Sequence, residues 1–63
     1  MPHVQITLLQ GRTPEQKRKI VEGITRVLVE EANTKRDGVT ISFLEVSKAD
    51  YASAGVLVLD RKD

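Results

Sequence analysis

The sequence predicts an α/β (α+β) fold: a single βαβ unit with a short C-terminal hairpin, forming one domain over residues 1–63. Two segments with apolar residues at every second position flank one segment with apolar residues at helical spacing. A further short apolar segment follows a glycine near the C-terminus. The length of 63 residues leaves room for one domain at most.

The first predicted strand covers residues 3–9. Alternation at a period of two is typical of a strand with one covered face. Gln5 and Thr7 occupy one face and Leu9 interrupts the alternation, while the other face carries Val4, Ile6 and Leu8.

The predicted helix runs from Pro14 to about Asn33. Thr13 is suited to cap it, Pro14 suits the first helical position, and Gln16 completes a capping box. An apolar stripe at helical spacing defines its covered face: Ile20, Val21, Ile24, Val27, Leu28 and Ala32.

The second predicted strand covers residues 39–46 and is followed by a loop over residues 47–55. Residues 56–59 form a third short strand or hairpin arm, and residues 60–63 form a charged tail. Because one long helix connects the first two strands, we expect those strands to be parallel. Apolar residues then remain on the sheet face away from the helix: Leu9, Leu44 and Val46.

The short chain needs a source of stability beyond its own core. It has no cysteine, which excludes disulfides and thiolate sites, and its one histidine, His3, cannot build a zinc site unaided. We therefore expect no metal site and predict a homo-oligomer that covers the open sheet face.

Composition argues against several classes of partner. The net charge of +1 lacks the basic character of a nucleic-acid surface, and Phe43 and Tyr51 are the only aromatic residues. We expect no nucleic acid and no membrane partner, since no apolar run reaches spanning length. The lack of cysteine and of a visible signal peptide favours a cytoplasmic location.

Pro2 is a candidate general base. A small second residue permits removal of Met1, which would leave a secondary amine at the start of a strand. An α-amino group titrates near neutral pH, and an apolar pocket or a nearby cation lowers its pKa, as proton abstraction beside a carbonyl requires. Taken alone, a proline at this position is better explained as a tolerated residue at a chain start.

A longer pattern favours the catalytic interpretation. Met-Pro-His-Val-Gln-Ile opens the first strand, and Gly-Arg-Thr-Pro-Glu-Gln-Lys follows it at residues 11–17. Leu44-Glu45-Val46 ends the second strand, and Tyr51 precedes a glycine-containing stretch. Across nearly its whole length the chain resembles the 4-oxalocrotonate tautomerase family.

The resemblance implies βαβ protomers that assemble into dimers and usually hexamers, with the C-terminal hairpin clasping a neighbour. It implies a small-molecule substrate, a 2-hydroxydienoate or related enol or keto acid, and neither a metal nor an organic cofactor. An arginine at the position of Arg12 binds a substrate carboxylate from an adjacent subunit. An aromatic residue at the position of Tyr51 forms an apolar wall beside the amino-terminal proline.

Other residues near the expected site have more than one interpretation. Leu9 ends the first strand and is a candidate pocket residue, although interface packing also accounts for it. His3 is assigned no catalytic role, since its side chain should lie on the opposite face from Pro2. The best-known family members carry a second arginine where this chain has Thr40, and Arg36 in the preceding turn is one replacement to consider.

We therefore expect a keto–enol tautomerase of the 2-hydroxymuconate type, with Pro2 as base and Arg12, Tyr51, Leu9 and Thr40 binding substrate. We expect a hexamer; the sequence leaves open a dimer or a mixed hexamer. The alternative is a non-catalytic subunit, or one completed by a partner chain that supplies the missing arginine. A strand-dimer DNA-binding module is disfavoured by the near-neutral charge.

Overall fold

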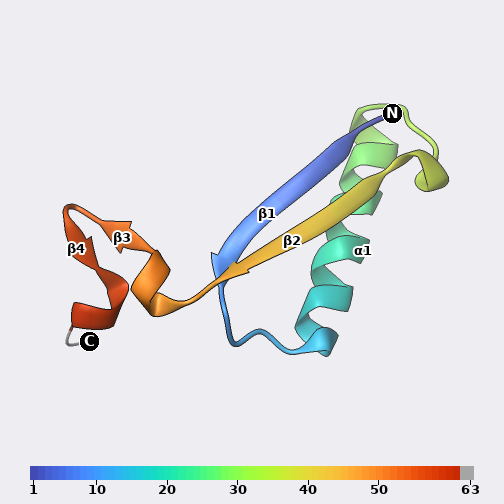
Figure 1. The fold of residues 1–63 in the computed structure, drawn as a ribbon. Helices are drawn as coiled ribbons and strands as arrows, with labels where there is room; N and C mark the ends of the chain where they lie inside the picture. Colours follow the sequence, from blue (N-terminus) through green and yellow to red (C-terminus); the bar gives the residue numbers. More distant parts are fainter. Residues whose placement is uncertain (62–63) are drawn as a thin grey trace.

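The computed structural model describes residues 1–61, which form a βαβ unit followed by a hairpin. The elements are β1 (His3–Leu9), α1 (Pro14–Glu31), β2 (Thr40–Val46), β3 (Ala52–Ser53) and β4 (Val56–Leu57). Strand β1 pairs with β2 in parallel, and β3 pairs with β4 antiparallel. Helix α1 lies against one face of the β1–β2 sheet, and the β3–β4 hairpin projects beyond the end of β2 (Figure 1). The predicted fold is confirmed.

The register between β1 and β2 determines which side chains face the helix. Ile6 lies opposite Phe43, and Leu8 lies opposite Glu45. Lys17 of α1 places its Nζ 5.6 Å from the centre of the Phe43 ring and 2.8 Å from a carboxylate oxygen of Glu45. Alternation therefore directs the other set away from α1: His3, Gln5, Thr7 and Leu9 of β1, and Thr40, Ser42, Leu44 and Val46 of β2.

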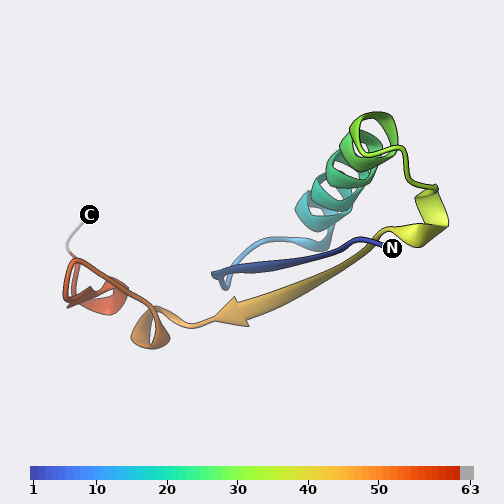
Figure 2. The same ribbon diagram turned by 90° about the horizontal axis from the view of Figure 1, so that it is seen from above.

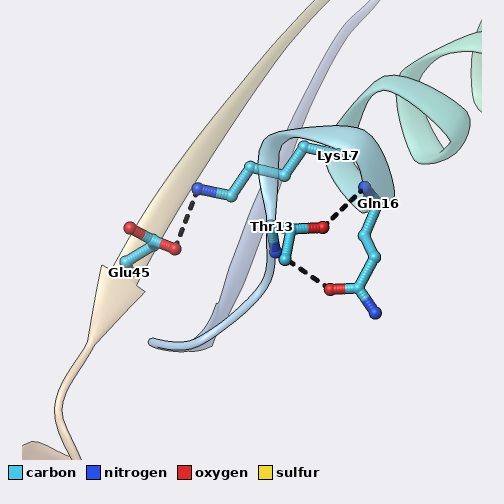
Figure 3. A network of polar contacts seen from close by, with 4 residues as sticks. All are labelled: Thr13, Gln16, Lys17 and Glu45. Atoms are coloured by element: carbon cyan, nitrogen blue, oxygen red, sulfur yellow. Dashed lines mark hydrogen bonds and ion pairs between the residues drawn. The ribbon is translucent and has the colours of Figure 1, made fainter.

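The beginning of α1 follows the sequence prediction closely. The Gln16 backbone N–H donates to Thr13 Oγ1 at 3.2 Å, and the Thr13 backbone N–H donates to Gln16 Oε1 at 2.9 Å (Figure 3). This reciprocal pair satisfies two backbone donors that the first helical turn would leave without partners.

The helix ends at Glu31, two residues before the predicted Asn33. The Ala32 backbone N–H still donates to the Leu28 carbonyl at 2.9 Å, but Asn33 has a φ of 56°. A left-handed residue at this position turns the chain out of the helix, and asparagine tolerates that conformation better than most residues.

The second strand begins at Thr40, one residue later than predicted. The Val39 backbone N–H donates to the Arg36 carbonyl at 3.2 Å and closes a 3₁₀ turn over Arg36–Gly38. Because this donor is already used within the turn, Val39 does not join the sheet.

The C-terminal hairpin also differs in detail from the prediction. The segment predicted as a loop, residues 47–55, contains the short strand β3. The strand predicted over residues 56–59 ends at Leu57, because Val58–Asp60 forms a 3₁₀ turn. Ala54 and Gly55 have φ angles of 54° and 79° and form the two-residue connection. Arg61 of the predicted charged tail donates to the Ser53 carbonyl at 2.7 Å, while residues 62 and 63 lie outside the described part.

Residues 1–61 of a single chain form no hydrophobic core. No side chain among residues 1–61 is buried, and the radius of gyration of 14.9 Å exceeds the ~10.6 Å expected for a compact chain of this length. Figure 2 shows the sheet with α1 on one side only and the hairpin extending away from both. Large apolar side chains are exposed on the sheet, helix and hairpin: Val27, Leu44, Tyr51, Val56, Leu57 and Leu59.

Within the part of the chain that the structure describes, no helix combines the length and hydrophobicity needed to cross a membrane.

Candidate active site

Pro2 lies at the N-terminal end of the sheet, immediately before β1. Its carbonyl accepts a hydrogen bond from the Thr40 backbone N–H at 3.1 Å, which fixes the chain start against β2. Met1 is 96% exposed, so the peptide bond that precedes Pro2 is accessible. While Met1 is attached, the Pro2 nitrogen is an amide and has no basic lone pair.

Thr40 starts β2 and lies opposite His3 in the register. His3 Nδ1 lies 2.7 Å from Thr40 Oγ1, and His3 Nε2 lies 3.1 Å from Ser42 Oγ. The Thr40 side chain is therefore held by the neighbouring strand on the sheet face away from α1. The sequence alone does not predict this cluster, because nothing local in it indicates which residues of β2 lie opposite His3.

Leu9 and Arg12 lie at the other end of β1. The Gln10 backbone N–H donates to the Val46 carbonyl at 2.9 Å and extends the sheet by one bond beyond Leu9. Gly11 then has a φ of 122°, a value that side-chain-bearing residues rarely adopt. This backbone turn brings Arg12 into an exposed loop.

The loop that carries Arg12 is anchored on its far side by the start of α1. The capping box fixes Thr13, and the Lys17–Glu45 ion pair ties the first helical turn to β2 (Figure 3). Within residues 1–61, Arg12 takes part in no ion pair, so its guanidinium is available to a carboxylate from outside the chain.

Tyr51 lies on the projecting C-terminal segment rather than on the sheet. It follows a 3₁₀ turn over Lys48–Asp50, and its carbonyl accepts from the Val58 backbone N–H at 2.8 Å. Its side chain is 47% exposed. In a single chain, therefore, Tyr51 leaves much of its surface for contacts beyond the protomer.

The predicted site residues fall into separate groups within one chain. Pro2 and Thr40 lie at one end of the sheet, whereas Leu9 and Arg12 lie at the other. Leu9 lies seven positions after Pro2 along an extended strand, which corresponds to about 23 Å at the usual rise. One small substrate cannot contact both groups of the same chain.

Two other features of the chain lie away from these groups. Arg36 Nη2 lies 2.6 Å from Glu22 Oε1, so this guanidinium is paired with α1. A groove of about 370 Å³ runs along α1, lined by Arg18, Lys19, Glu22, Gly23 and Arg26. One helix supplies all five side chains and none is a predicted site residue, so we do not assign the site to this groove.

Comparisons with known proteins identify the fold and then the family. The crystal structure of YwhB, a homologue of 4-oxalocrotonate tautomerase, has the same fold with a TM-score of 0.92 and 34% identity, covering 97% of this chain and all of that chain. Residues 2–61 match the family model described as Tautomerase enzyme. This chain therefore belongs to the tautomerase family.

Two relatives named 2-hydroxymuconate tautomerase match this chain over most of its length and most of theirs. The 2-hydroxymuconate tautomerase of Bacillus subtilis (strain 168) is 37% identical over 60 residues, which cover 95% of this chain and 97% of the relative. The 2-hydroxymuconate tautomerase of Comamonas testosteroni is 39% identical over 56 residues, which cover 89% of each chain. Membership of the family thus extends over the βαβ unit and the C-terminal hairpin together.

Proposed function

We propose that this chain is a cofactor-independent keto–enol tautomerase of the 2-hydroxymuconate type, with Pro2 as general base once Met1 is removed. The observation that carries the proposal is the position of Pro2, immediately before the first strand and directly after an exposed methionine. Relatives of nearly full length that are named 2-hydroxymuconate tautomerase support the choice of substrate class.

The proposed reaction moves one proton and needs no redox partner. The neutral amine of Pro2 accepts the proton of the substrate enol hydroxyl, and the electron pair left on oxygen forms the ketone. The conjugated double bonds shift, and the protonated amine delivers the same proton to carbon. Arg12 of an adjacent protomer binds a substrate carboxylate, and its charge disfavours the protonated amine through repulsion.

The remaining proposed contacts shape the pocket. Tyr51 and Leu9 supply apolar surface that excludes water from the amine, which lowers the pKa of the amine because burial disfavours its charged form. Thr40 supplies a hydroxyl for a polar group of the substrate.

The proposed site requires more than one copy of the chain. Since Pro2 and Arg12 lie at opposite ends of β1, the Pro2 end of one protomer must meet the Arg12 end of another. The open sheet face and the exposed hairpin provide apolar surface for that contact. We propose a homo-oligomer, and a hexamer as its form.

The test is turnover by a homogeneous sample whose loss of Met1 has been verified by mass spectrometry. With 2-hydroxymuconate and no added metal or cofactor, we expect isomerisation whose rate rises with pH through an apparent pKa below that of an ordinary α-amino group. Pro2→Ala should be impaired but not inactive, because a primary amine remains. A processed, oligomeric sample without turnover would contradict the proposal.

The same assay separates this proposal from a partner-completed subunit. Thr40 is the residue that favours the alternative, because a hydroxyl does not supply a positive charge. A chain that is inactive alone but active after mixing with a second tautomerase chain would support the mixed oligomer.

A further inference from the structure

The segment that carries Arg12 is short and is bonded at both ends. Gln10 makes the last backbone hydrogen bond of the sheet at 2.9 Å, and Thr13 caps α1. Only Gly11 and Arg12 lie between these two anchors. The place of Arg12 therefore depends on how the start of α1 sits relative to the end of β2.

One side-chain pair fixes the start of α1 against the end of β2. Lys17 Nζ lies 2.8 Å from Glu45 Oε2 and 5.6 Å from the centre of the Phe43 ring (Figure 3). The Lys17 backbone N–H donates to the Thr13 carbonyl at 3.1 Å, so the lysine belongs to the turn that ends the loop. Within residues 1–61, the other ion pairs of α1 join it to itself or to the turn before β2.

This pair is more sheltered than an ordinary surface ion pair. The side chains of Lys17 and Glu45 are 27% and 36% exposed, whereas those of the Arg18–Glu15 pair are 73% and 68% exposed. Water screens a partly covered pair less, and the Phe43 ring adds a further attraction for the ammonium group. The pair can therefore hold one geometry where an exposed pair would exchange partners with water.

We infer that Lys17 and Glu45 are positioning residues for Arg12. Their pair holds the loop so that the guanidinium meets the carboxylate of a substrate bound at Pro2 of an adjacent protomer. The Lys17 ammonium is already engaged by Glu45, so it acts through Arg12 rather than on the substrate. The inference rests on the proposed function, because it assumes that Arg12 binds substrate.

Substitutions on both sides of the pair test the inference. Lys17→Met keeps an aliphatic stem against Phe43 and loses the charge, and Glu45→Gln keeps the size of the side chain. With 2-hydroxymuconate and the processed oligomer, each should raise KM and lower kcat/KM about 3–10-fold, with little change in kcat. Lys17→Arg keeps the charge and its attraction to the ring, so it should retain most of the wild-type value.

A double-mutant cycle separates positioning from general damage. In the Arg12→Ala background, Lys17→Met should cause no further loss, because no guanidinium remains to be positioned. Lys17→Met combined with Glu45→Gln should be no worse than either change alone. Lys19→Met is the matched control, because Lys19 is exposed, lies near Lys17 on the same helix and takes part in no ion pair within residues 1–61.

Backbone motion provides a readout that does not depend on turnover. Nuclear magnetic relaxation at the Arg12 amide should show a more mobile loop in Lys17→Met and Glu45→Gln than in the wild type or Lys19→Met. Sedimentation and circular dichroism establish that each variant keeps its assembly and fold. If Lys17→Met does not assemble, Glu45→Gln carries the same test, because it leaves Lys17 over the Phe43 ring.

The inference is overturned if the variants leave KM and the Arg12 amide unchanged. It is also overturned if Lys17→Met lowers kcat/KM equally with and without Arg12. Either result in a chain whose wild type turns over 2-hydroxymuconate would overturn the positioning role alone. No turnover by the processed wild type would overturn the proposed function and the inference with it.

Discussion

Arg12 combines an exposed position with the lack of an ion-pair partner among residues 1–61, in a loop fixed at both ends. This combination is what a carboxylate-binding residue requires, because the guanidinium loses no existing partner when the substrate arrives. Gly11 contributes through its φ of 122°, which turns the chain between the last sheet bond and the helix cap.

Arg12→Ala should therefore raise KM for a carboxylate substrate and lower kcat/KM roughly 10–150-fold, as expected for the loss of a charge-assisted hydrogen bond. Steady-state kinetics on the processed oligomer provide the measurement. Arg26→Ala removes an exposed arginine of α1 outside the proposed site and should have no effect. Equal kinetics for both variants would exclude Arg12 from the site.

Thr40→Arg gives a complementary prediction. A guanidinium beside Pro2 would pair with a second carboxylate, so the variant should improve turnover of 2-hydroxymuconate more than turnover of an enol acid lacking the far group. The ratio of the two kcat/KM values measures this effect. An unchanged ratio would mean that another cation already reaches this position.

At the scale of elements, the hairpin contains a strained connection. Ala54 has a φ of 54°, a conformation that costs a side-chain-bearing residue about 1–2 kcal/mol, whereas glycine adopts it readily. Glycine loses more conformational entropy on folding than alanine, which offsets part of the relieved strain. Ala54→Gly should therefore stabilise the hairpin by up to about 1 kcal/mol.

Hydrogen exchange at the Val58 amide, which bonds to the Tyr51 carbonyl, measures the stability of this segment directly. Ala54→Gly should slow that exchange, and Ala52→Gly should accelerate it, because Ala52 lies in extended β3 where glycine only adds flexibility. Faster exchange in Ala54→Gly would show that the turn is not strained.

The sequence predicted the elements well where local signals exist. The capping box fixed the start of α1 to the residue, and alternation assigned the strand faces. The predicted end of α1 is two residues too late, because the left-handed conformation of Asn33 has no strong local signal. The predicted start of β2 is one residue too early, because the 3₁₀ turn over Arg36–Gly38 has none either. The His3 cluster depended on the register of a parallel pair separated by α1, which sequence spacing does not encode.

At the scale of the whole molecule, a single chain leaves its apolar surface largely uncovered. It has no buried side chain within residues 1–61, and its open sheet face divides into a polar end at His3 and an apolar end at Leu44. Leu44 is 51% exposed, although burying such a side chain contributes roughly 1.5–3 kcal/mol. We therefore expect the apolar end of this face to lie against another copy.

Sedimentation should show an oligomer, with hexamer as the expected mass, and no stable folded monomer at micromolar concentration. Leu44→Lys should weaken the assembly and lower activity together, because the proposed site combines residues of different copies. A folded, active monomer would contradict both the assembly and the shared site.

The central claim is that the free amine of Pro2 is the base, and a matched pair of samples tests it most directly. One sample retains Met1 and the other lacks it, each homogeneous by mass spectrometry and of the same oligomeric state. We expect the processed sample to isomerise 2-hydroxymuconate and the sample retaining Met1 not to, because an amide nitrogen cannot accept the proton. Full activity in the sample that retains Met1 would contradict the mechanism.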